Sequence, residues 1–283
     1  MAERAAGHRT RVGFIGLGSQ GGPMARRIVE ESYPLTLWAR RRATTEAFGD
    51  TDAVVAASPA ELGAASDLVC LCVVADPDVE DVMLRPDGVL TGMAPGGVVV
   101  IHSTIHPDTC RHVADEAAKR AVAVVDAPVS GGGGAAAERR LLVMAGGEEA
   151  DVARCRPVLE TFADPVIHLG PLGSGQLAKL LNNFVFTAQF GLALDTFSFA
   201  ERLGMDRAAV ARVLGHGSGG SRAAGILAAS GFDASGLRRA RPLLLKDVDL
   251  MREVARVAEA AEPPTLTRLA THTLALLDTE QSP

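Results

Sequence analysis

Cysteine is scarce in this chain, and the pattern of the few that occur excludes two kinds of site. The four cysteines among 283 residues are Cys70, Cys72, Cys110 and Cys155, and their spacing lacks the pairing typical of zinc sites. Cys70 and Cys72 alternate within an apolar run, so we expect them on one face of a strand. We interpret the four as buried, reduced thiols of a cytoplasmic protein, without disulfides.

Long hydrophobic runs and a strong excess of one charge are also absent. No apolar run approaches the length of a membrane span, and the N-terminus lacks the apolar core of a secretion signal. The net charge is −6 without a basic stripe, so neither nucleic acid nor a membrane is an expected partner. His102 and His106 flank a strand end rather than share a helix, so we expect no metal there.

Lysine is also scarce, because only Lys119, Lys179 and Lys246 stand among 28 basic residues. A buried amine can lose its proton, whereas a guanidinium cannot. A chain that uses arginine this freely is expected to keep some lysines for chemistry.

The first 170 residues alternate short apolar runs with helical stretches. Strands are predicted at 12–16, 35–39, 68–74, 98–102, 122–126, 141–145 and 166–169. Helices are predicted between them, at 23–31, 59–65, 79–84, 107–120 and 148–162. This alternation favours an α/β domain with a doubly wound, mostly parallel sheet over residues 1–170.

Residues 171–283 lack a convincing strand and are predicted to form an all-α domain. Its first helix, at 174–202, is apolar on nearly every face, which predicts a long buried helix between the domains. Further helices are predicted at 207–214, 223–229, 239–260 and 266–277.

A glycine-rich loop follows the first predicted strand and opens a helix. Its residues are Gly16, Leu17, Gly18, Ser19, Gln20 and Gly21, in the pattern GxGxxG that binds dinucleotides. The first glycine permits a tight turn, the second lets the backbone approach the pyrophosphate, and the third allows close packing of helix and strand. The helix N-terminus then faces the phosphates. The alternative is a structural glycine turn.

The second predicted strand indicates which dinucleotide is bound. It ends in Arg40, Arg41 and Arg42 and has no acid to hold the ribose 2′-hydroxyl of NAD. An arginine there accommodates the 2′-phosphate of NADP, so we predict NADP(H), bound by Arg40 and Arg41, with NAD as the alternative. Val73 and Val74 are also predicted to contact the cofactor. The structural alternative is that the turn at residues 40–42 is merely basic and exposed to solvent.

Two further segments could carry the chemistry. Ser130, Gly131 and Gly132 follow a strand, and their backbone N–H groups and the serine hydroxyl could hold a carboxylate. Lys179 and Asn183 are four residues apart on the long predicted helix, so they share one face. Desolvation would disfavour the charge of Lys179 and help it transfer protons near neutral pH. The structural alternative for residues 130–132 is a plain turn, and for Lys179 it is a side chain that extends to the surface.

Two other patterns concern the Lys246–Asp247 pair and Ser130. Lys246 and Asp247 lie in a later predicted helix and could equally form a surface ion pair. The GxSxG motif of many serine hydrolases is absent, so Ser130 is not interpreted as a nucleophile.

Five segments in this order resemble the β-hydroxyacid dehydrogenase family, which includes 3-hydroxyisobutyrate dehydrogenase and tartronate semialdehyde reductase. The resemblance covers nearly the whole chain and rests on residues 13–25 (GFIGLGSQGGPMA), 102–105 (HSTI), 126–132 (DAPVSGG), 173–183 (GSGQLAKLLNN) and 246–247 (KD). It implies an N-terminal Rossmann domain and a helical C-terminal domain, in a homodimer or homotetramer built on the helical domain.

The resemblance also implies roles for single residues. Lys179 would be the general acid/base with Asn183 beside it, and Ser130, Gly131 and Gly132 would grip the carboxylate of a small substrate. Thr104 would line the nicotinamide site, and Lys246 would close over cofactor or substrate.

The chain departs from the family pattern at three positions. Gln20 stands where the family often has methionine, and this is expected to matter little. Arg139 replaces a glycine usual after the DAPVSGG turn, so the local turn there is expected to differ. Arg222 stands where members often carry an aromatic residue near the substrate. As a second cation it could bind a dianionic or more acidic substrate.

The expected reaction interconverts a small hydroxy acid and its semialdehyde with NAD(P). Two alternatives remain. Imine reductases look similar but usually carry aspartate or tyrosine at the position of Lys179. Non-catalytic dinucleotide-binding scaffolds tend to lose this lysine.

Overall fold

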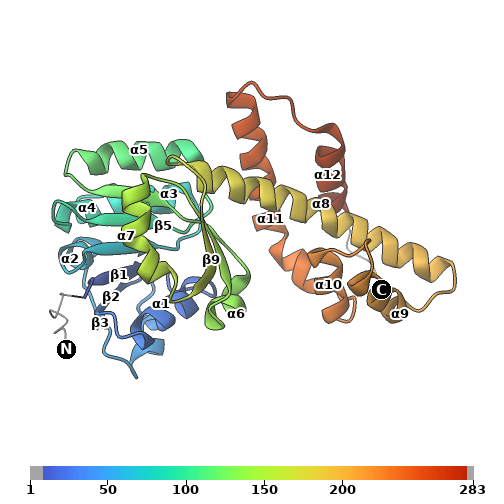
Figure 1. Cartoon of the computed structure of the whole chain (residues 1–283), viewed down its shortest axis with the longest axis horizontal. Coiled ribbons are helices and arrows are strands. Elements are labelled where there is room, and N and C mark those ends of the chain that lie inside the picture. The colour runs from blue at the N-terminus through green and yellow to red at the C-terminus, as the bar shows by residue number, and fades with distance from the viewer. Residues whose placement is uncertain (1–8, 279–283) are drawn as a thin grey trace, which may run out of the picture. The chain divides into compact units, whose positions relative to one another are not determined.

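A parallel six-stranded sheet organises the first part of the chain (Figure 1). The strand order is β3-β2-β1-β4-β5-β6. The chain adds β2 and β3 on one side of β1 and then returns to add β4, β5 and β6 on the other side. The register places Val12 of β1 opposite both Leu35 of β2 and Leu68 of β4. The strands are β1 (Val12–Ile15), β2 (Leu35–Trp38), β3 (Val54–Val55), β4 (Leu68–Leu71), β5 (Val98–Ile101) and β6 (Ala123–Asp126).

The computed structural model describes residues 9–278, and the chain divides into two units, Met1–Lys179 and Leu180–Pro283. The first unit carries the sheet and the second is helical. This confirms the predicted fold class, a doubly wound Rossmann domain followed by an all-α domain.

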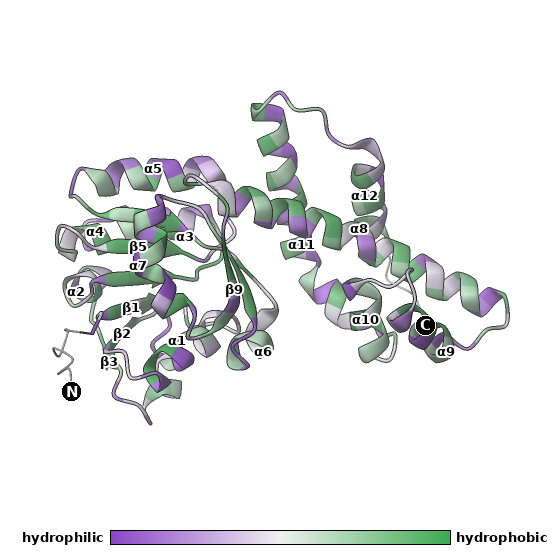
Figure 2. Ribbon diagram, viewed as in Figure 1, coloured by the Kyte–Doolittle hydropathy of each residue, from purple (hydrophilic) through white to green (hydrophobic). Residues whose placement is uncertain are grey.

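Helices cover both faces of the six-stranded sheet, which is why its central strands β1, β4 and β5 are hydrophobic throughout (Figure 2). Side chains alternate along β4, so that Cys70 packs with α1 and α7 while Leu71 packs with the helices of the other face. Cys72 lies on the same face as Cys70, as predicted, and burial raises its pKa to about 12. The helices are α1 (Gly21–Glu30), α2 (Pro59–Ala64), α3 (Asp76–Leu84), α4 (Val89–Gly92), α5 (Pro107–Ala118) and α7 (Glu149–Leu159), with 3₁₀ turns η1 (Arg42–Thr44) and η2 (Glu46–Phe48).

A second, three-stranded sheet adjoins β6. Its strands β7 (Val129–Ser130) and β8 (Leu141–Ala145) are antiparallel, and β9 (Ala163–His168) runs parallel to β8. A backbone bridge between Asp126 and Gly146 links it to the main sheet. Helix α6 (Gly132–Ala137) connects β7 and β8, and Arg139 after it has a φ of 57°. The arginine therefore adopts the left-handed conformation that favours glycine.

The second unit is built on α8 (Ser174–Arg202), which begins in the first unit and continues beyond Lys179. Phe190 and Phe197 pack with α9 and α10, and Phe184 packs with α11 and α12. The bounds are α9 (Arg207–His216), α10 (Arg222–Ala229), α11 (Ser235–Val257) and α12 (Pro264–Asp278).

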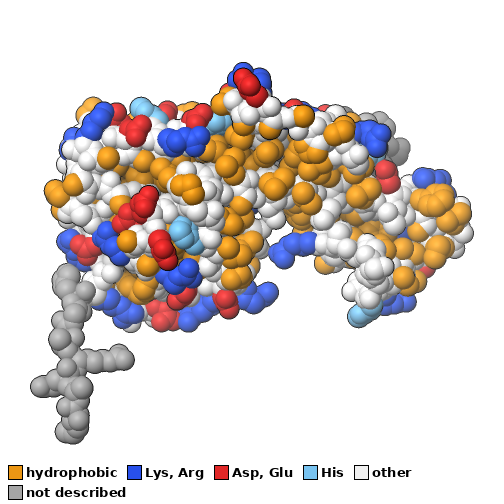
Figure 3. All heavy atoms as spheres, turned by 45° about the horizontal axis from the view of Figure 1, so that its top comes forward, with side chains coloured by type: hydrophobic (Ala, Val, Ile, Leu, Met, Phe, Trp, Pro, Cys, Tyr) orange, Lys and Arg blue, Asp and Glu red, His pale blue; other side chains and the backbone are white. Residues whose placement is uncertain are grey.

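The prediction that α8 is buried on nearly every face is wrong. Five of its apolar residues are 38% to 56% exposed, namely Leu177, Leu181, Val185, Leu192 and Phe199. Figure 3 shows that hydrophobic side chains gather at the surface of the chain. Hydropathy along a segment reports how apolar it is, whereas burial depends on which neighbours cover each face. The predicted homodimer or homotetramer stays a prediction. None of the helices within residues 9–278 has both the length and the apolarity that crossing a membrane requires.

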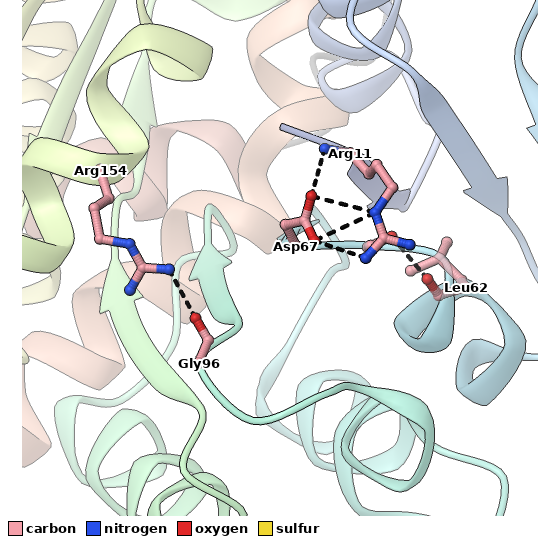
Figure 4. Close-up of polar contacts among 6 residues, drawn as sticks. Arg11, Leu62, Asp67, Gly96 and Arg154 are labelled. Atoms are coloured by element: carbon pink, nitrogen blue, oxygen red, sulfur yellow. Dashed lines mark hydrogen bonds and ion pairs between the residues drawn. The ribbon is translucent and has the colours of Figure 1, made fainter. Parts of the chain in front are cut away.

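Polar contacts join the amino ends of β1 and β4 and hold α7 against the start of β5 (Figure 4). The Arg11 guanidinium, just before β1, contacts the Asp67 carboxylate, just before β4, at 2.7 Å. Arg154 of α7 donates to the Gly96 carbonyl at 2.7 Å, two residues before β5. The opposite edge, where the strands end, is where ligands bind in sheets of this kind.

His102 immediately follows β5 and is enclosed in the core. Its ring stacks on Phe14 with centroids 6.4 Å apart and meets the edge of Phe162 at 5.7 Å. Its Nδ1 lies 2.8 Å from the Ala127 carbonyl oxygen, and the side chain is almost inaccessible to solvent. Burial disfavours the imidazolium and lowers the pKa of His102 from 6.5 to about 4.

This burial predicts an acid-dependent loss of stability. Between pH 6.5 and about 4 the unfolded chain binds a proton at His102 that the folded chain does not. The free energy of unfolding should therefore fall over this range, with a contribution from His102 of about 3 kcal/mol. Urea unfolding at several pH values should show a pH dependence smaller by that amount in His102→Gln and His102→Phe. A dependence in both variants equal to that of the wild type would contradict the assignment.

Candidate active site

The glycine loop lies where β1 ends and α1 begins. Gly16 has a φ of 98°, and a Cβ on it would lie 2.1 Å from the Cys72 carbonyl oxygen. A Cβ on Gly21 would lie 2.0 Å from the Gly16 carbonyl oxygen, so helix and strand approach too closely for any side chain. A Cβ on Gly18 would meet nothing within 4 Å, which leaves open space beside the loop.

The start of α1 fits an anion. Gln20 stands at its N-cap and gives the helix no side-chain hydrogen bond; its amide instead lies 3.5 Å from the Met24 sulfur. The first turn has no acidic residue. The N–H groups of a helix start carry partial positive charge, so this loop can receive the pyrophosphate of a dinucleotide.

The arginine turn after β2 is exposed. The Arg40 side chain is 60% exposed, and its guanidinium contacts the Asp78 carboxylate of α3 at 2.8 Å. Arg41 accepts a hydrogen bond from the Thr44 hydroxyl on its carbonyl at 2.8 Å, which shapes the turn into η1. An exposed ion pair of this kind is weak and can rearrange around a phosphate.

The loops after β4 and β5 lie against each other. The Val73 N–H donates to the Ser103 hydroxyl at 2.9 Å, while Val74 is exposed. Thr104 is half-buried beside Ser103. Both loops start at the carboxyl edge of the sheet, as does the glycine loop.

The serine–glycine turn packs on the glycine loop. Ser130 ends β7, and Gly131 and Gly132 have φ values of 135° and 77°. A Cβ on Gly133 would lie 2.2 Å from the Ser19 carbonyl oxygen, so the first turn of α6 touches the glycine loop. The turn predicted to hold a carboxylate and the loop predicted to hold a cofactor are therefore neighbours within the first unit.

A buried carboxylate joins the end of β6 to the start of α8. Asp126 is inaccessible to solvent, and its two oxygens accept N–H groups from Gly173 and Gln176, each at 2.7 Å. Burial raises the pKa of Asp126, and the two backbone N–H bonds oppose this shift.

Gln176 joins the same turn of α8 to the loop after β5. Its side-chain Nε2 donates to the Ser103 carbonyl at 2.8 Å, and its Oε1 accepts the Ile105 N–H at 3.1 Å. The side chain is inaccessible to solvent. Lys179 is half-buried one turn further along α8.

The second unit holds the remaining predicted residues. The Asn183 side-chain Nδ2 donates to Asp247 Oδ2 at 2.6 Å, and the Lys246 ammonium lies 3.4 Å from Asp247 Oδ1. Asp247 is buried, so the pair with Lys246 is not a simple surface ion pair. Arg222 opens α10 and is exposed, after Ser221 caps that helix.

Three residues gained no role of their own from the sequence: Asp126, Gln176 and Asp247. Each is a polar residue beside or within an apolar run, which is the signal that could have marked it. Pattern alone could not find their partners, which lie 50, 73 and 64 residues away along the chain.

Two family models match the chain in succession. Residues 11–170 match the NAD-binding domain of 6-phosphogluconate dehydrogenase. Residues 173–281 match the NAD-binding domain of NADP-dependent 3-hydroxyisobutyrate dehydrogenase. The matches follow the division between the sheet and the helical region.

Individual proteins agree with these matches. The chain is 32% identical over 219 residues to mitochondrial 3-hydroxyisobutyrate dehydrogenase of Mus musculus, which covers 77% of this chain but 65% of that enzyme's length. It is 30% identical over 262 residues to the NAD-dependent L-serine dehydrogenase of Pseudomonas aeruginosa, covering 89% and 88% of the two chains. Its structure is similar to that of Mycobacterium tuberculosis 3-hydroxyisobutyrate dehydrogenase with L-serine, with a TM-score of 0.82, 27% identity, and coverage of 95% and 93%. The chain therefore belongs to the β-hydroxyacid dehydrogenase family.

Proposed function

We propose that this protein is an NAD(P)-dependent oxidoreductase that interconverts a small hydroxy acid of the 3-hydroxy acid type and its semialdehyde. The observation that carries the proposal is the contact between the serine–glycine turn and the glycine loop, at Gly133 and Ser19. A turn that holds a carboxylate beside the cofactor loop fixes the reacting carbon of the substrate near the cofactor, which is the condition for hydride transfer.

The proposed mechanism assigns each step to residues of this chain. The Ser130 hydroxyl and the N–H groups of Gly131 and Gly132 bind the substrate carboxylate. Thr104 would line the site of the nicotinamide ring, which, when bound, would supply or accept the hydride. In reduction, the Lys179 ammonium donates a proton to the carbonyl oxygen, and in oxidation the amine removes the hydroxyl proton. Asn183, one turn along α8 and held by Asp247, orients the oxygen or the amine. Lys246 contacts cofactor or substrate.

The lysine separates this function from its alternatives. Imine reductases usually carry aspartate or tyrosine at this position, and non-catalytic scaffolds tend to lose the lysine. Turnover of semialdehydes that depends on Lys179 supports the proposal, whereas tight NADPH binding without turnover of any semialdehyde supports the scaffold.

Lys179→Ala should abolish most turnover without loss of cofactor binding. Removal of a general acid/base typically lowers kcat by about 100- to 10,000-fold. Steady-state NADPH consumption with a panel of semialdehydes measures kcat, and NADPH fluorescence titration measures Kd. The matched control is Lys119→Ala, because Lys119 is 65% exposed and pairs with Glu116 on α5. Near-normal turnover in Lys179→Ala would exclude the mechanism.

The cofactor is proposed to be NADP(H), with Arg40 as the main contact of the 2′-phosphate and Arg41 beside it. Arg40 and Arg41 follow the end of β2, where an arginine accommodates a 2′-phosphate, and this position supports the choice. Wild-type kcat/KM should be higher with NADPH than with NADH. Arg40→Ser should lower kcat/KM for NADPH by about 10- to 100-fold, the value of hydrogen bonds to a charged group, and leave NADH use nearly unchanged. Arg256→Ala, at another exposed ion pair, is the control. A wild-type preference for NADH would reject the assignment.

Arg222 is proposed to contact the substrate as a second cation. If so, Arg222→Ala should lower kcat/KM for a dianionic semialdehyde by about 10-fold or more and affect a monoanionic semialdehyde of similar size less. Initial rates with the two substrates give the ratio directly. Equal rates for wild type and variant on both substrates would remove Arg222 from the site.

A further inference from the structure

The Gln176 side chain pairs with the backbone as a neighbouring strand would. It donates to the carbonyl of Ser103 and accepts the N–H of Ile105, the two backbone groups that flank Thr104. The amide therefore fixes the peptide units on both sides of the residue that is proposed to line the nicotinamide site. An apolar side chain of the same size would fill the space but leave both backbone groups unpaired.

Gln176 is also fixed at its own backbone. Its N–H donates to Asp126 Oδ2, while Asp126 Oδ1 holds the N–H of Gly173. The first turn of α8 is thus bound to the strand that leads into the Ser130 turn. Lys179 lies three residues after Gln176, about 4.5 Å along the helix axis and on a neighbouring row of side chains.

These contacts connect three groups that the proposed reaction requires. Ser103 holds the Val73 N–H through its hydroxyl, so the loops after β4 and β5 belong to the same network. Asp126 precedes Ser130 by four residues in the chain. Two buried side chains, Asp126 and Gln176, therefore join the helix turn before Lys179 to the segments that carry Ser130 and Thr104.

We propose that Gln176, anchored by Asp126, is a positioning residue that holds Lys179 in register with the nicotinamide loop. The proposal rests on the proposed function, because it assigns Lys179 the proton transfer. Gln176 itself contacts neither substrate nor cofactor. Its loss acts through the distance between the amine and the reacting oxygen, on which the rate of proton transfer depends.

The test compares two substitutions that differ in hydrogen bonding. Gln176→Met keeps the volume and removes both bonds, so kcat for semialdehyde reduction should fall by about 100-fold, the typical cost of a displacement near 1 Å. The KM for the semialdehyde and the Kd for NADPH should change little. Gln176→Glu keeps the shape, but its introduced carboxyl group donates to the Ser103 carbonyl only when protonated.

Gln176→Glu therefore has a pH signature that a purely structural role lacks. The titratable groups facing this side chain are the Asp126 carboxylate and the Cys110 thiol of α5, which contacts the Gln176 side chain. Burial beside them raises the pKa of the introduced carboxyl group. Its kcat, divided by that of the wild type at each pH, should rise towards one as the pH falls, whereas the ratio for Gln176→Met should stay low throughout. Assays are run at a temperature at which circular dichroism shows every variant folded.

Thr161→Val is the matched control for stability. The Thr161 hydroxyl is buried in the same unit and donates to the Val158 carbonyl at 2.7 Å, at the end of α7. This variant should lose stability but keep the wild-type kcat. If Gln176→Met also keeps the wild-type kcat, or if the Gln176→Glu ratio is independent of pH, the positioning role is wrong.

The outcomes separate this inference from the function on which it rests. If Lys179→Ala retains its turnover, or the wild type turns over no semialdehyde, the proposed function fails and the positioning role fails with it. If Lys179→Ala is inactive while both Gln176 variants match Thr161→Val, only the positioning role fails.

Discussion

The hydrogen bonds between the Asp126 carboxylate and the start of α8 are the interaction on which the carboxyl edge of the six-stranded sheet depends. The carboxylate is buried at the end of β6 and accepts two N–H groups from the start of α8. A helix start has N–H groups without partners inside the helix, and a buried carboxylate needs donors. Each therefore satisfies the other, and the contact fixes where α8 leaves the sheet and where Lys179 stands.

Close backbone approaches complete this edge. Gly16 lies against Cys72 and Gly133 lies against Ser19, each at a separation that admits no side chain. The glycine loop, the loop after β4 and the serine–glycine turn are therefore held by contacts between backbones. Backbone contacts of this kind change little when surface side chains change, which suits the role proposed for this edge, holding a substrate and a cofactor in register.

The helical unit contrasts with this rigid edge. Its helices bury two separate apolar clusters along α8, yet Leu192 and Phe199 on the same helix stay exposed. In the same unit, Asp247 is buried and accepts a hydrogen bond from the Asn183 side chain.

The sequence by itself determined the local features. The GxGxxG spacing predicted the loop between β1 and α1, and short apolar runs predicted seven of the nine strands found within residues 9–278, each to within a few residues. The bounds of α8 were predicted at 174 and 202. These features depend on neighbours in the chain. The short elements β3, β7, α4 and α6 were missed because they span two to six residues and carry no periodicity. Only the tertiary structure decided which face of α8 is covered and which backbone groups the buried side chains of Asp126 and Gln176 bind. Their partners lie about 50 to 70 residues away, and no local pattern encodes a contact at that distance.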